Sequence, residues 1–260
     1  MNLSAIIAAR HRAVAGFSTE AQNYFDRLDT AGDTTYTPYK QPLANYIDGL
    51  VALGGAYWDT MVSACSFVGV GIEGIVVPLR SGMTVPSNIL FLTADLSQTT
   101  GLKGDGSTTY IDTNVLENAV PQNDISMSVY VTEAFSTYGL SISGTAGNDR
   151  TGLMIRPGSG GIVWNRSPTS SGFTPAAQPE FYGTNRDNAS DYDLQNGSTL
   201  TTNTLTSGSV YTLVPVCVFA AANGVGKTPN RLATYHYGPA LNMATLRSLQ
   251  ATLMSEIAAI

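Results

Sequence analysis

A glycine-rich segment, VCVFAAANGVGKTPNR at 216–231, contains the residue types of a phosphate-binding loop. An apolar run leads into Gly224-Val225-Gly226-Lys227-Thr228, as a strand leads into the loop of nucleotide-binding proteins. That motif also needs a glycine five residues before Gly226 and a helix directly after the lysine and threonine. Ala221 and Pro229 stand at these places. We therefore predict no nucleotide site, and expect the segment to be the loop of an antiparallel hairpin.

Two clusters of aromatic and polar side chains could bind a sugar, which needs an apolar ring face beside fixed hydrogen-bonding groups. Each also has an alternative explanation, as part of the core or of a turn. The predicted carbohydrate-binding residues are Trp164, Arg166, Tyr182 and Asn185. Oxygen ligands for Ca²⁺ are most crowded at Asp187, Asn188 and Asp191, where they also suit a hairpin turn. No other cofactor is expected.

The composition limits the classes of partner. Only 12% of the residues are charged and the net charge is −6, while glycine accounts for 26 residues. Lysine and arginine are scattered, so we expect no nucleic-acid partner. Low charge and hydroxyl-rich surfaces suit packing between subunits, which favours a symmetric homo-oligomer. Cys65 and Cys217 lie far apart in apolar surroundings and are interpreted as buried free thiols.

Neither a secretory signal nor a membrane span is predicted. The first residues, MNLSAIIAARHRAVAG, lack a long apolar segment. The most apolar stretch, 62–79, is interrupted by Glu73 and by glycines.

Helical spacing of apolar residues dominates up to about residue 85. Thr19 and Gln22 form a capping-box signal, and Thr37-Pro38 predicts a second helix start. A third helix is expected over 57–67. The chain returns to helix after Asn242, which can cap it. The apolar stripe of this last helix consists of Leu246, Leu249, Leu253, Met254 and Ile257.

After residue 85 the apolar spacing changes to every second residue, which is typical of strands. Met127, Val129 and Val131 alternate with hydroxyl residues and predict a half-buried strand. Asn196-Gly197 predicts a hairpin turn. Many short strands without intervening helices favour an antiparallel sandwich. The candidate strands are 89–93, 108–112, 126–132, 138–143, 152–156, 161–165, 180–185, 191–195, 199–205, 210–219 and 231–237.

Several phrases resemble those of bacteriophage and prophage virion proteins that carry a concanavalin A-like lectin/glucanase (LamG-like) sandwich. These are GLKGDGSTTYIDTN at 101–114, PQNDISMSVYVTE at 121–133, EFYGTNRDNASDYDLQNGS at 180–198 and RLATYHYGPALNMATLRSLQATLMSEI at 231–257. The stretch YFDRLDTAGDTTYTPYKQPLANYIDGLVALGGAYWDTM, 24–61, is similar to the helical segment that precedes this sandwich in phage tail proteins. There the family usually has Gly-(Ile/Leu)-Trp, where this chain has the longer Gly55-Ala56-Tyr57-Trp58.

The resemblance implies a mainly β chain with a concanavalin A-like, jelly-roll sandwich. The expected parts are a helical attachment module at 1–84, the sandwich at 85–241, and a C-terminal helix at 242–260 packed on the sandwich or on a neighbouring subunit. It also implies a virion location, in a tail, baseplate or fibre, with attachment to other virion proteins and an outward domain for host-surface glycan. The alternatives are a capsid-decorating or assembly protein without a ligand, and a free lectin or degenerate glycosidase, which the lack of an export signal disfavours.

Some relatives in this fold are glycosidases, which need two carboxyl groups about 5 Å apart for a retaining mechanism. In sandwich hydrolases these come from Glu-x-Asp-x-(x)-Glu on one strand, a spacing that no glutamate of this chain shows. Asp191 and Asp193 share a strand face but have no glutamate nearby. His236 is interpreted as a sheet histidine with satisfied hydrogen bonds, and the other imidazole is His11. We therefore expect no enzymatic activity. The six glutamates are Glu20, Glu73, Glu117, Glu133, Glu180 and Glu256.

Overall fold

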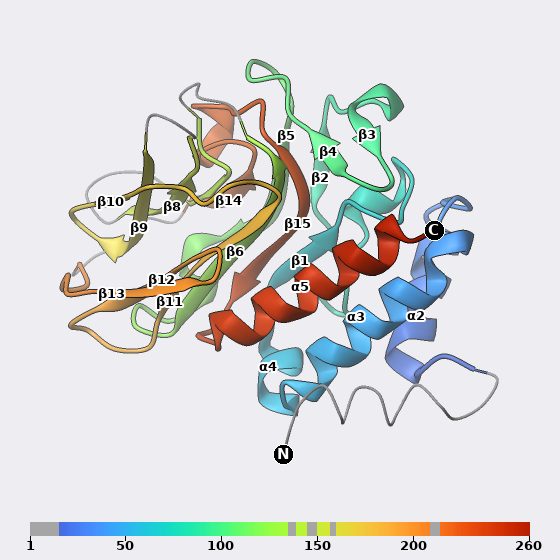
Figure 1. The fold of residues 1–260 in the computed structure, drawn as a ribbon, viewed down its shortest axis with the longest axis horizontal. Coiled ribbons are helices and arrows are strands. Elements are labelled where there is room, and N and C mark those ends of the chain that lie inside the picture. The colour runs from blue at the N-terminus through green and yellow to red at the C-terminus, as the bar shows by residue number, and fades with distance from the viewer. Residues whose placement is uncertain (1–15, 135–138, 145–149, 157–159, 209–213) are drawn as a thin grey trace.

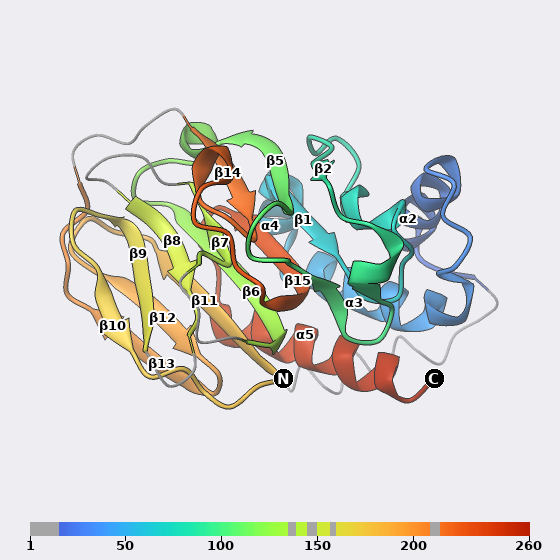
Figure 2. The same ribbon diagram turned by 90° about the horizontal axis from the view of Figure 1, so that it is seen from above.

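A computed structural model describes residues 16–134, 139–144, 150–156, 160–208 and 214–260. The described chain forms three layers: a group of helices, a first antiparallel sheet (sheet A) and a second antiparallel sheet (sheet B) (Figures 1 and 2). The helices lie on the face of sheet A that is turned away from sheet B, called here its outer face. The predicted fold class, an antiparallel sandwich with N-terminal helices and a C-terminal helix, is confirmed.

Sheet A contains the central strands of the molecule. In spatial order it consists of β13 (Thr199–Asn203), β12 (Tyr192–Asn196), β11 (Glu180–Arg186), β6 (Ile125–Glu133), β15 (Arg231–Gly238), β4 (Gly101–Lys103) and β3 (Leu96–Ser97), and β1 (Ser63–Ser66) also pairs with β15. Sheet B consists of β10 (Ser171–Phe173), β9 (Gly161–Ser167), β8 (Arg150–Met154), β7 (Ile142–Ser143), β14 (Pro215–Val218), β5 (Tyr110–Leu116) and β2 (Ser87–Ile89).

Local capping signals account for the helix starts. The helices are α2 (Thr19–Thr30), α3 (Lys40–Ala52), α4 (Gly55–Thr60) and α5 (Met243–Ala258). Ser18 caps α2 by accepting a bond from the Ala21 amide at 3.1 Å, one residue before the predicted cap. Asn242 caps α5 as predicted, with a 3.0 Å bond from the Thr245 amide. Pro38 lies in a single 3-10 turn, η1 (Thr37–Tyr39), so the predicted helix begins only at Lys40.

The helix α5 docks on its own chain, between α3 and the outer face of β11. Leu246, Leu249, Leu253 and Ile257 are buried in this contact, while Met254 is half-buried. The absence of a side chain at Gly49 lets Leu249 approach α3 closely. This arrangement is the first of the two predicted alternatives for the C-terminal helix.

The glycine-rich segment 216–231 joins the two sheets. Because β14 belongs to sheet B and β15 to sheet A, the segment crosses between the sheets, so the predicted hairpin is wrong. The connection between β14 and β15, residues 219–230, is long enough to cross the roughly 10 Å between stacked sheets. Lys227 donates to the carbonyl of Gly224 in the same loop and lies over the ring of Tyr110. In contrast, the predicted Asn196-Gly197 turn does join β12 to β13, with Gly197 at φ 57°.

Two predictions were wrong because elements distant in the sequence pair with the predicted helix or cover the predicted strand. The predicted helix over 57–67 ends at Thr60, and β1 follows, because its backbone groups pair with β15. The strand β6 is buried on both faces except at its last two residues, because helices cover its outer face. The strand that was predicted to be half-buried is therefore buried on both faces over most of its length. The short strands β3, β4 and β10 were not predicted, and residues 138 and 210–213 of the predicted strands lie outside the described residues, as does His11.

The larger of two hydrophobic clusters in the described chain extends from Ala21 in α2 to Ile257 in α5, and the smaller one contains Leu140, Met154 and Trp164. The predicted boundaries at 84/85 and 241/242 therefore do not separate independent cores. Cys65 and Cys217 are free and buried, as predicted, and burial raises their thiol pKa values to about 12 and about 11. Among the described helices, none has both the length and the apolar character that crossing a bilayer requires.

Candidate functional site

A polar cleft of about 410 Å³ lies where the N-terminus of α5 meets the outer face of sheet A. We call it the α5 cleft. Its lining combines oxygen-bearing side chains with a few apolar ones. The lining residues are Asn185, Asp187, Asp193, Leu200, Ala240, Leu241, Asn242, Met243 and Ala244.

Strand register brings the polar residues of the α5 cleft together. Asn185 and Asp193 are direct partners on β11 and β12, and Asp193 is the partner of Thr202 on β13, so all three share the outer face. The Thr202 hydroxyl donates to Asp193 at 2.6 Å. The side-chain carbonyl oxygen of Asn185 accepts a hydrogen bond from the backbone N–H of Leu241 at 2.7 Å, which fixes the loop that leads into α5. Asn185 thus positions the helix that forms the opposite wall.

The α5 cleft offers both hydrogen-bond donors and acceptors. Asp187 and Asp193 supply carboxylate oxygens, and the amides of Asn185 and Asn242 supply donors. The first backbone N–H groups of α5 have no acceptor within the helix and can donate to a ligand. The first turn of α5 contains no acidic residue. Leu200, which is 53% exposed, adds an apolar surface. A hydroxyl group both donates and accepts, so this lining suits a polyol.

The α5 cleft has a negative charge. Asp187 and Asp193 are its charged lining residues, and neither forms an ion pair within the part of the chain that the structure describes. Its lining contains no aromatic ring. The cleft therefore suits neutral or cationic groups better than anionic ones.

Asn188 and Asp191, predicted with Asp187 as a calcium site, form a turn. The Asn188 side-chain amide donates to Asp187 and to Asp191, both at 2.9 Å. Its carbonyl oxygen accepts the backbone amides of Ser190 and Asp191. The two carboxylates thus bond to an amide between them instead of facing a common point. No group of three or more His, Cys, Asp or Glu side chains in the described ranges could hold a metal ion. The geometry favours the turn that was the alternative for these residues.

The two aromatic residues predicted as sugar platforms are buried, so this interpretation was wrong. Tyr182 has no exposed surface, and its hydroxyl donates to the Ala176 carbonyl at 2.8 Å. Trp164 is 8% exposed and packs with Leu140 and Met154. Neither ring offers a free face to a ligand. Phe173 of sheet B contacts the ring of Tyr182, whereas Leu140 and Met154 cover Trp164.

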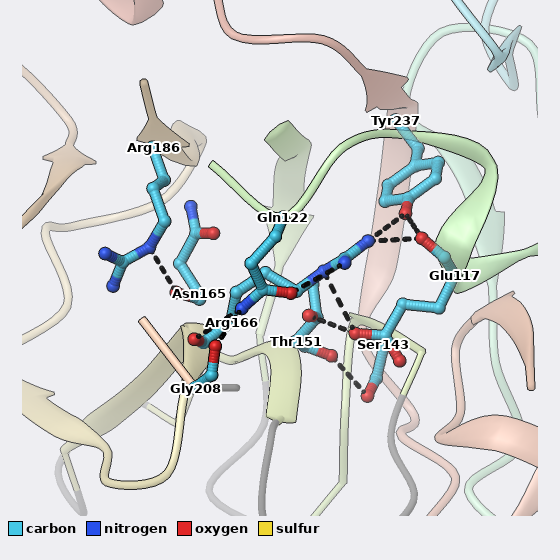
Figure 3. Close-up of polar contacts among 9 residues, drawn as sticks. All are labelled: Glu117, Gln122, Ser143, Thr151, Asn165, Arg166, Arg186, Gly208 and Tyr237. Atoms are coloured by element: carbon cyan, nitrogen blue, oxygen red, sulfur yellow. Dashed lines mark hydrogen bonds and ion pairs between the residues drawn. The ribbon is translucent and has the colours of Figure 1, made fainter. Parts of the chain in front are cut away.

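Arg166, also predicted to bind carbohydrate, lies fully buried between the two sheets (Figure 3). It adopts a φ of 52° on β9, and its Nε lies 3.3 Å from a carboxylate oxygen of Glu117. Its Nη2 donates to the Glu117 carbonyl and, at 3.2 Å, to the hydroxyl of Tyr237. Its Nη1 donates to Gln122 at 3.3 Å. Arg166 therefore has a structural role, and its assignment as a surface ligand was wrong.

The surrounding contacts extend this network across both sheets. The Tyr237 hydroxyl, on β15 of sheet A, donates to the Glu117 carbonyl at 2.6 Å. Thr151, on β8 of sheet B, donates to the Glu117 carboxylate. Gln122 donates to the Gly208 carbonyl at 2.9 Å, and Figure 3 shows the contacts as a network that extends from Gly208 to Tyr237. We call Glu117, Gln122, Thr151, Arg166 and Tyr237 the inter-sheet cluster.

A second cleft, of about 220 Å³, lies in the helical layer. Its two acidic and two basic side chains have charges that cancel, so it favours neither an anion nor a cation. Its lining residues are Glu20, Asn23, Arg27, Trp58, Asp59, Arg80 and Ser81.

His236 is a buried sheet residue, as predicted, but its hydrogen bonds are not satisfied. Neither ring nitrogen has a hydrogen-bond partner among the residues that the structure describes, and burial lowers the pKa of the imidazole to about 3. The ring packs against Tyr57 of α4, with centroids 5.5 Å apart. Such a histidine is neutral and enclosed, away from the α5 cleft.

No protein-family model and no curated protein matches this sequence. Among solved structures, domain 4 of an extracellular arabinanase from Geobacillus stearothermophilus, in complex with arabinotriose, is 12% identical with a TM-score of 0.43. That similarity covers 73% of this chain and 98% of the other. The binding domain of botulinum neurotoxin serotype D is 10% identical with a TM-score of 0.47, over 75% of this chain and 52% of the other.

A third structure is tailspike protein 2 of Escherichia coli O157:H7 bacteriophage CAB120. It is 11% identical with a TM-score of 0.37, over 70% of this chain and 26% of the other. This chain thus spans about half of the neurotoxin domain and about a quarter of the tailspike. At these identities the similarity is one of general architecture and does not extend to site residues.

Proposed function

We propose that this chain is a non-enzymatic structural protein of a bacteriophage virion, in the tail, baseplate or fibre, and that it binds a host-surface glycan in the α5 cleft. The observation that supports glycan binding is the α5 cleft itself. There, carboxylates, side-chain amides and the start of a helix face one another beside the exposed Leu200. The virion role rests on the sequence phrases at 101–114 and 180–198 and on the low charge of the chain.

The chemistry of the lining narrows the glycan class. Sugar hydroxyls donate to Asp187 and Asp193 and accept from the amides of Asn185 and Asn242. Leu200 contacts the C–H groups of the ring. Two carboxylates without counterions disfavour sialic acids and other anionic sugars, so the ligand is a neutral or amino sugar.

Titration of the full-length chain against a panel of neutral, amino and anionic oligosaccharides tests the proposal. We expect binding of neutral or amino sugars. Asp193→Ala and Asp187→Ala each weaken it by about tenfold, the effect of losing roughly 1.4 kcal/mol of hydrogen bonding. Asp26→Ala is the matched control, because Asp26 is an exposed carboxylate on α2, outside the lining of the cleft. Thermal melts of each variant verify folding.

Two results would contradict the proposal. A wild-type chain that binds no glycan, while its helical layer binds another virion component, would favour the alternative of a pure assembly or capsid-decorating protein. Release of reducing sugar from a host polysaccharide would show that the chain is an enzyme, against the non-enzymatic part of the proposal.

A further inference from the structure

The edge strands at the two ends of the sandwich differ in length and exposure. Sheet A ends in β13, with five residues, and in β3, with two, and sheet B ends in β10 and β2, with three each. Short edges are one of the ways in which proteins avoid pairing with other chains. The strand β13 departs from this pattern, whereas β1, a four-residue strand that pairs with β15, is buried. Its first four residues are exposed, and within the described chain it pairs with β12 alone.

The sequence around β13 lacks the charges that usually protect an edge. No Asp, Glu, Lys, Arg or His occurs between Asp193 and Lys227, and none between Arg166 and Glu180. The first stretch contains β13 and the second contains β10. Figures 1 and 2 place β10 and β13 at the same end of the sandwich, so both edges there lie in uncharged sequence. Threonine-rich strands have high β propensity, and nothing in Thr199–Asn203 opposes pairing.

The opposite end of sheet A is charged. Lys103, on β4, pairs with Glu133 at 3.3 Å, and Arg231 lies 3.6 Å from the same carboxylate. Asp95 immediately precedes β3. A second copy that docked at this end would place like charges next to these side chains, which would repel it.

We infer that a second copy of this chain docks edge to edge on β13, so that sheet A continues across both subunits. A second copy is the occupant that the charges favour. The chain has a net charge of −6, so two copies repel each other over most of their surface, whereas β13 itself carries no charge. Asp193, which bonds to Thr202, lies on β12, one strand away from the edge where the copies meet. Two identical strands that pair antiparallel are related by a two-fold axis, which closes the assembly as a dimer. The edge of β10 at the same end adds contact area beyond the strand pair.

This dimer goes beyond the glycan proposal and leaves the α5 cleft open. Leu200 lies on the outer face of β13, where it lines the cleft, while the new contact forms along the edge of the strand. Docking therefore brings two clefts onto one continuous outer face. Two sites on one rigid sheet increase avidity for a surface that carries many copies of a ligand.

Cysteine cross-linking of the full-length chain tests the pairing directly. Opposite residues of an antiparallel pair have Cα atoms about 4.5–5.5 Å apart, within reach of a disulfide. The native Cys65 and Cys217 are buried and do not interfere. Single cysteines replace each of the exposed residues of β13 in turn. We expect mild oxidation to convert at least one of Thr199→Cys, Leu200→Cys, Thr201→Cys and Thr202→Cys to a covalent dimer. Thr34→Cys, an exposed control in the helical part, stays monomeric on denaturing gels.

Sedimentation velocity provides the second measurement. The wild-type chain sediments as a dimer, and Thr201→Lys, which brings two ammonium groups together at the edge, sediments as a monomer with an unchanged melt. Thr34→Lys, with the same charge change, remains a dimer. If Thr201→Lys does not fold, the cross-linking pattern decides. A monomeric wild type, or an oligomer that survives Thr201→Lys and yields no cross-link from β13, would overturn the inference, whatever the result of the glycan titrations.

Discussion

Two clusters of buried polar side chains lie on opposite faces of the central strands of sheet A, and they differ in how their hydrogen bonds are satisfied. The inter-sheet cluster joins Glu117, Arg166 and Tyr237 by an ion pair and several hydrogen bonds. On the outer face, beneath the helices, lie Ser128 and His236, which are direct partners on β6 and β15. Tyr237 and His236 are consecutive residues, so strand alternation alone sends them to the two faces.

The outer cluster, Ser128, Thr234 and His236, contains buried polar atoms without partners. Within the described parts of the chain, the hydroxyls of Ser128 and Thr234 and both nitrogens of His236 form no hydrogen bond. An unsatisfied buried polar group costs about 1–3 kcal/mol, whereas a satisfied one contributes about 1 kcal/mol to stability. We therefore expect the polar side chains to contribute more to stability on the inner face of β15, where the ion pair lies, than on its outer face. The predictions below test this difference.

Loss of the inter-sheet ion pair has the largest expected effect. Glu117→Ala leaves the guanidinium of Arg166 buried without its carboxylate, which lowers the free energy of unfolding by about 3–5 kcal/mol. Urea denaturation measures the change. Glu133→Ala is the control, because that carboxylate is 45% exposed and its pairs with Lys103 and Arg231 contribute less than about 1 kcal/mol. Equal losses in the two variants would show that the inter-sheet cluster does not stabilise the sandwich.

Acid has the next largest effect, through His236. The folded chain protonates this imidazole only near its pKa of about 3, whereas the unfolded chain does so near 6.5. Stability that is fully present above pH 6.5 is therefore lost as the pH falls towards 3, by up to about 1.4 kcal/mol per pH unit. The groups that face the ring are Tyr57 of α4, Ser128 of β6 and Ala64 of β1, and none is a carboxylate that could stabilise the cation.

The variant His236→Leu isolates this contribution from that of the carboxylates. Between pH 6.5 and 4.5 the wild type loses about 2–3 kcal/mol more than the variant. Chemical denaturation at several pH values gives the two curves. Parallel curves would mean that the imidazole is not enclosed by α4, and the outer cluster would then not distinguish the two faces.

Local signals predicted much of the fold. A cap at Asn242 and a turn at Asn196-Gly197 each depend on a few adjacent residues, and both appear in the structure. The strand around Met127 also appears, but it is buried on both faces instead of one. The strand β1 could not be predicted in this way. Its residues are compatible with a helix, and only pairing with β15, some 170 residues away, makes them a strand.

The candidate site was predicted in part. Asn185 and Asp187 line the α5 cleft as predicted binding residues, but Asp193 was considered only as a carboxylate without a glutamate partner, and Asn242 only as a helix cap. These residues meet because the chain returns from β15 to start α5 above β11 and β12. Arg166 was assigned to a carbohydrate site because it lies close to Trp164 in the sequence. Only its contact with Glu117, 49 residues earlier in the chain, shows why it is inside.

A matched pair of threonine substitutions has the smallest expected effects and compares the two clusters most directly. Thr151 in the inter-sheet cluster and Thr234 in the outer cluster are both buried strand residues. Thr151→Val removes a donor to the Glu117 carboxylate and costs about 1–3 kcal/mol. Thr234→Val removes a hydroxyl that has no partner, so it changes stability by less than about 1 kcal/mol or increases it.

Because valine and threonine have nearly the same shape, packing contributes little to either change, and the difference between the two variants measures the hydrogen bonding alone. Urea denaturation of both variants at neutral pH gives this difference. If Thr234→Val is as destabilising as Thr151→Val, the Thr234 hydroxyl is hydrogen-bonded in solution, by a buried water molecule or by a shifted side chain. The Thr234 and Thr151 hydroxyls would then contribute alike, and hydrogen bonding would not distinguish these two positions.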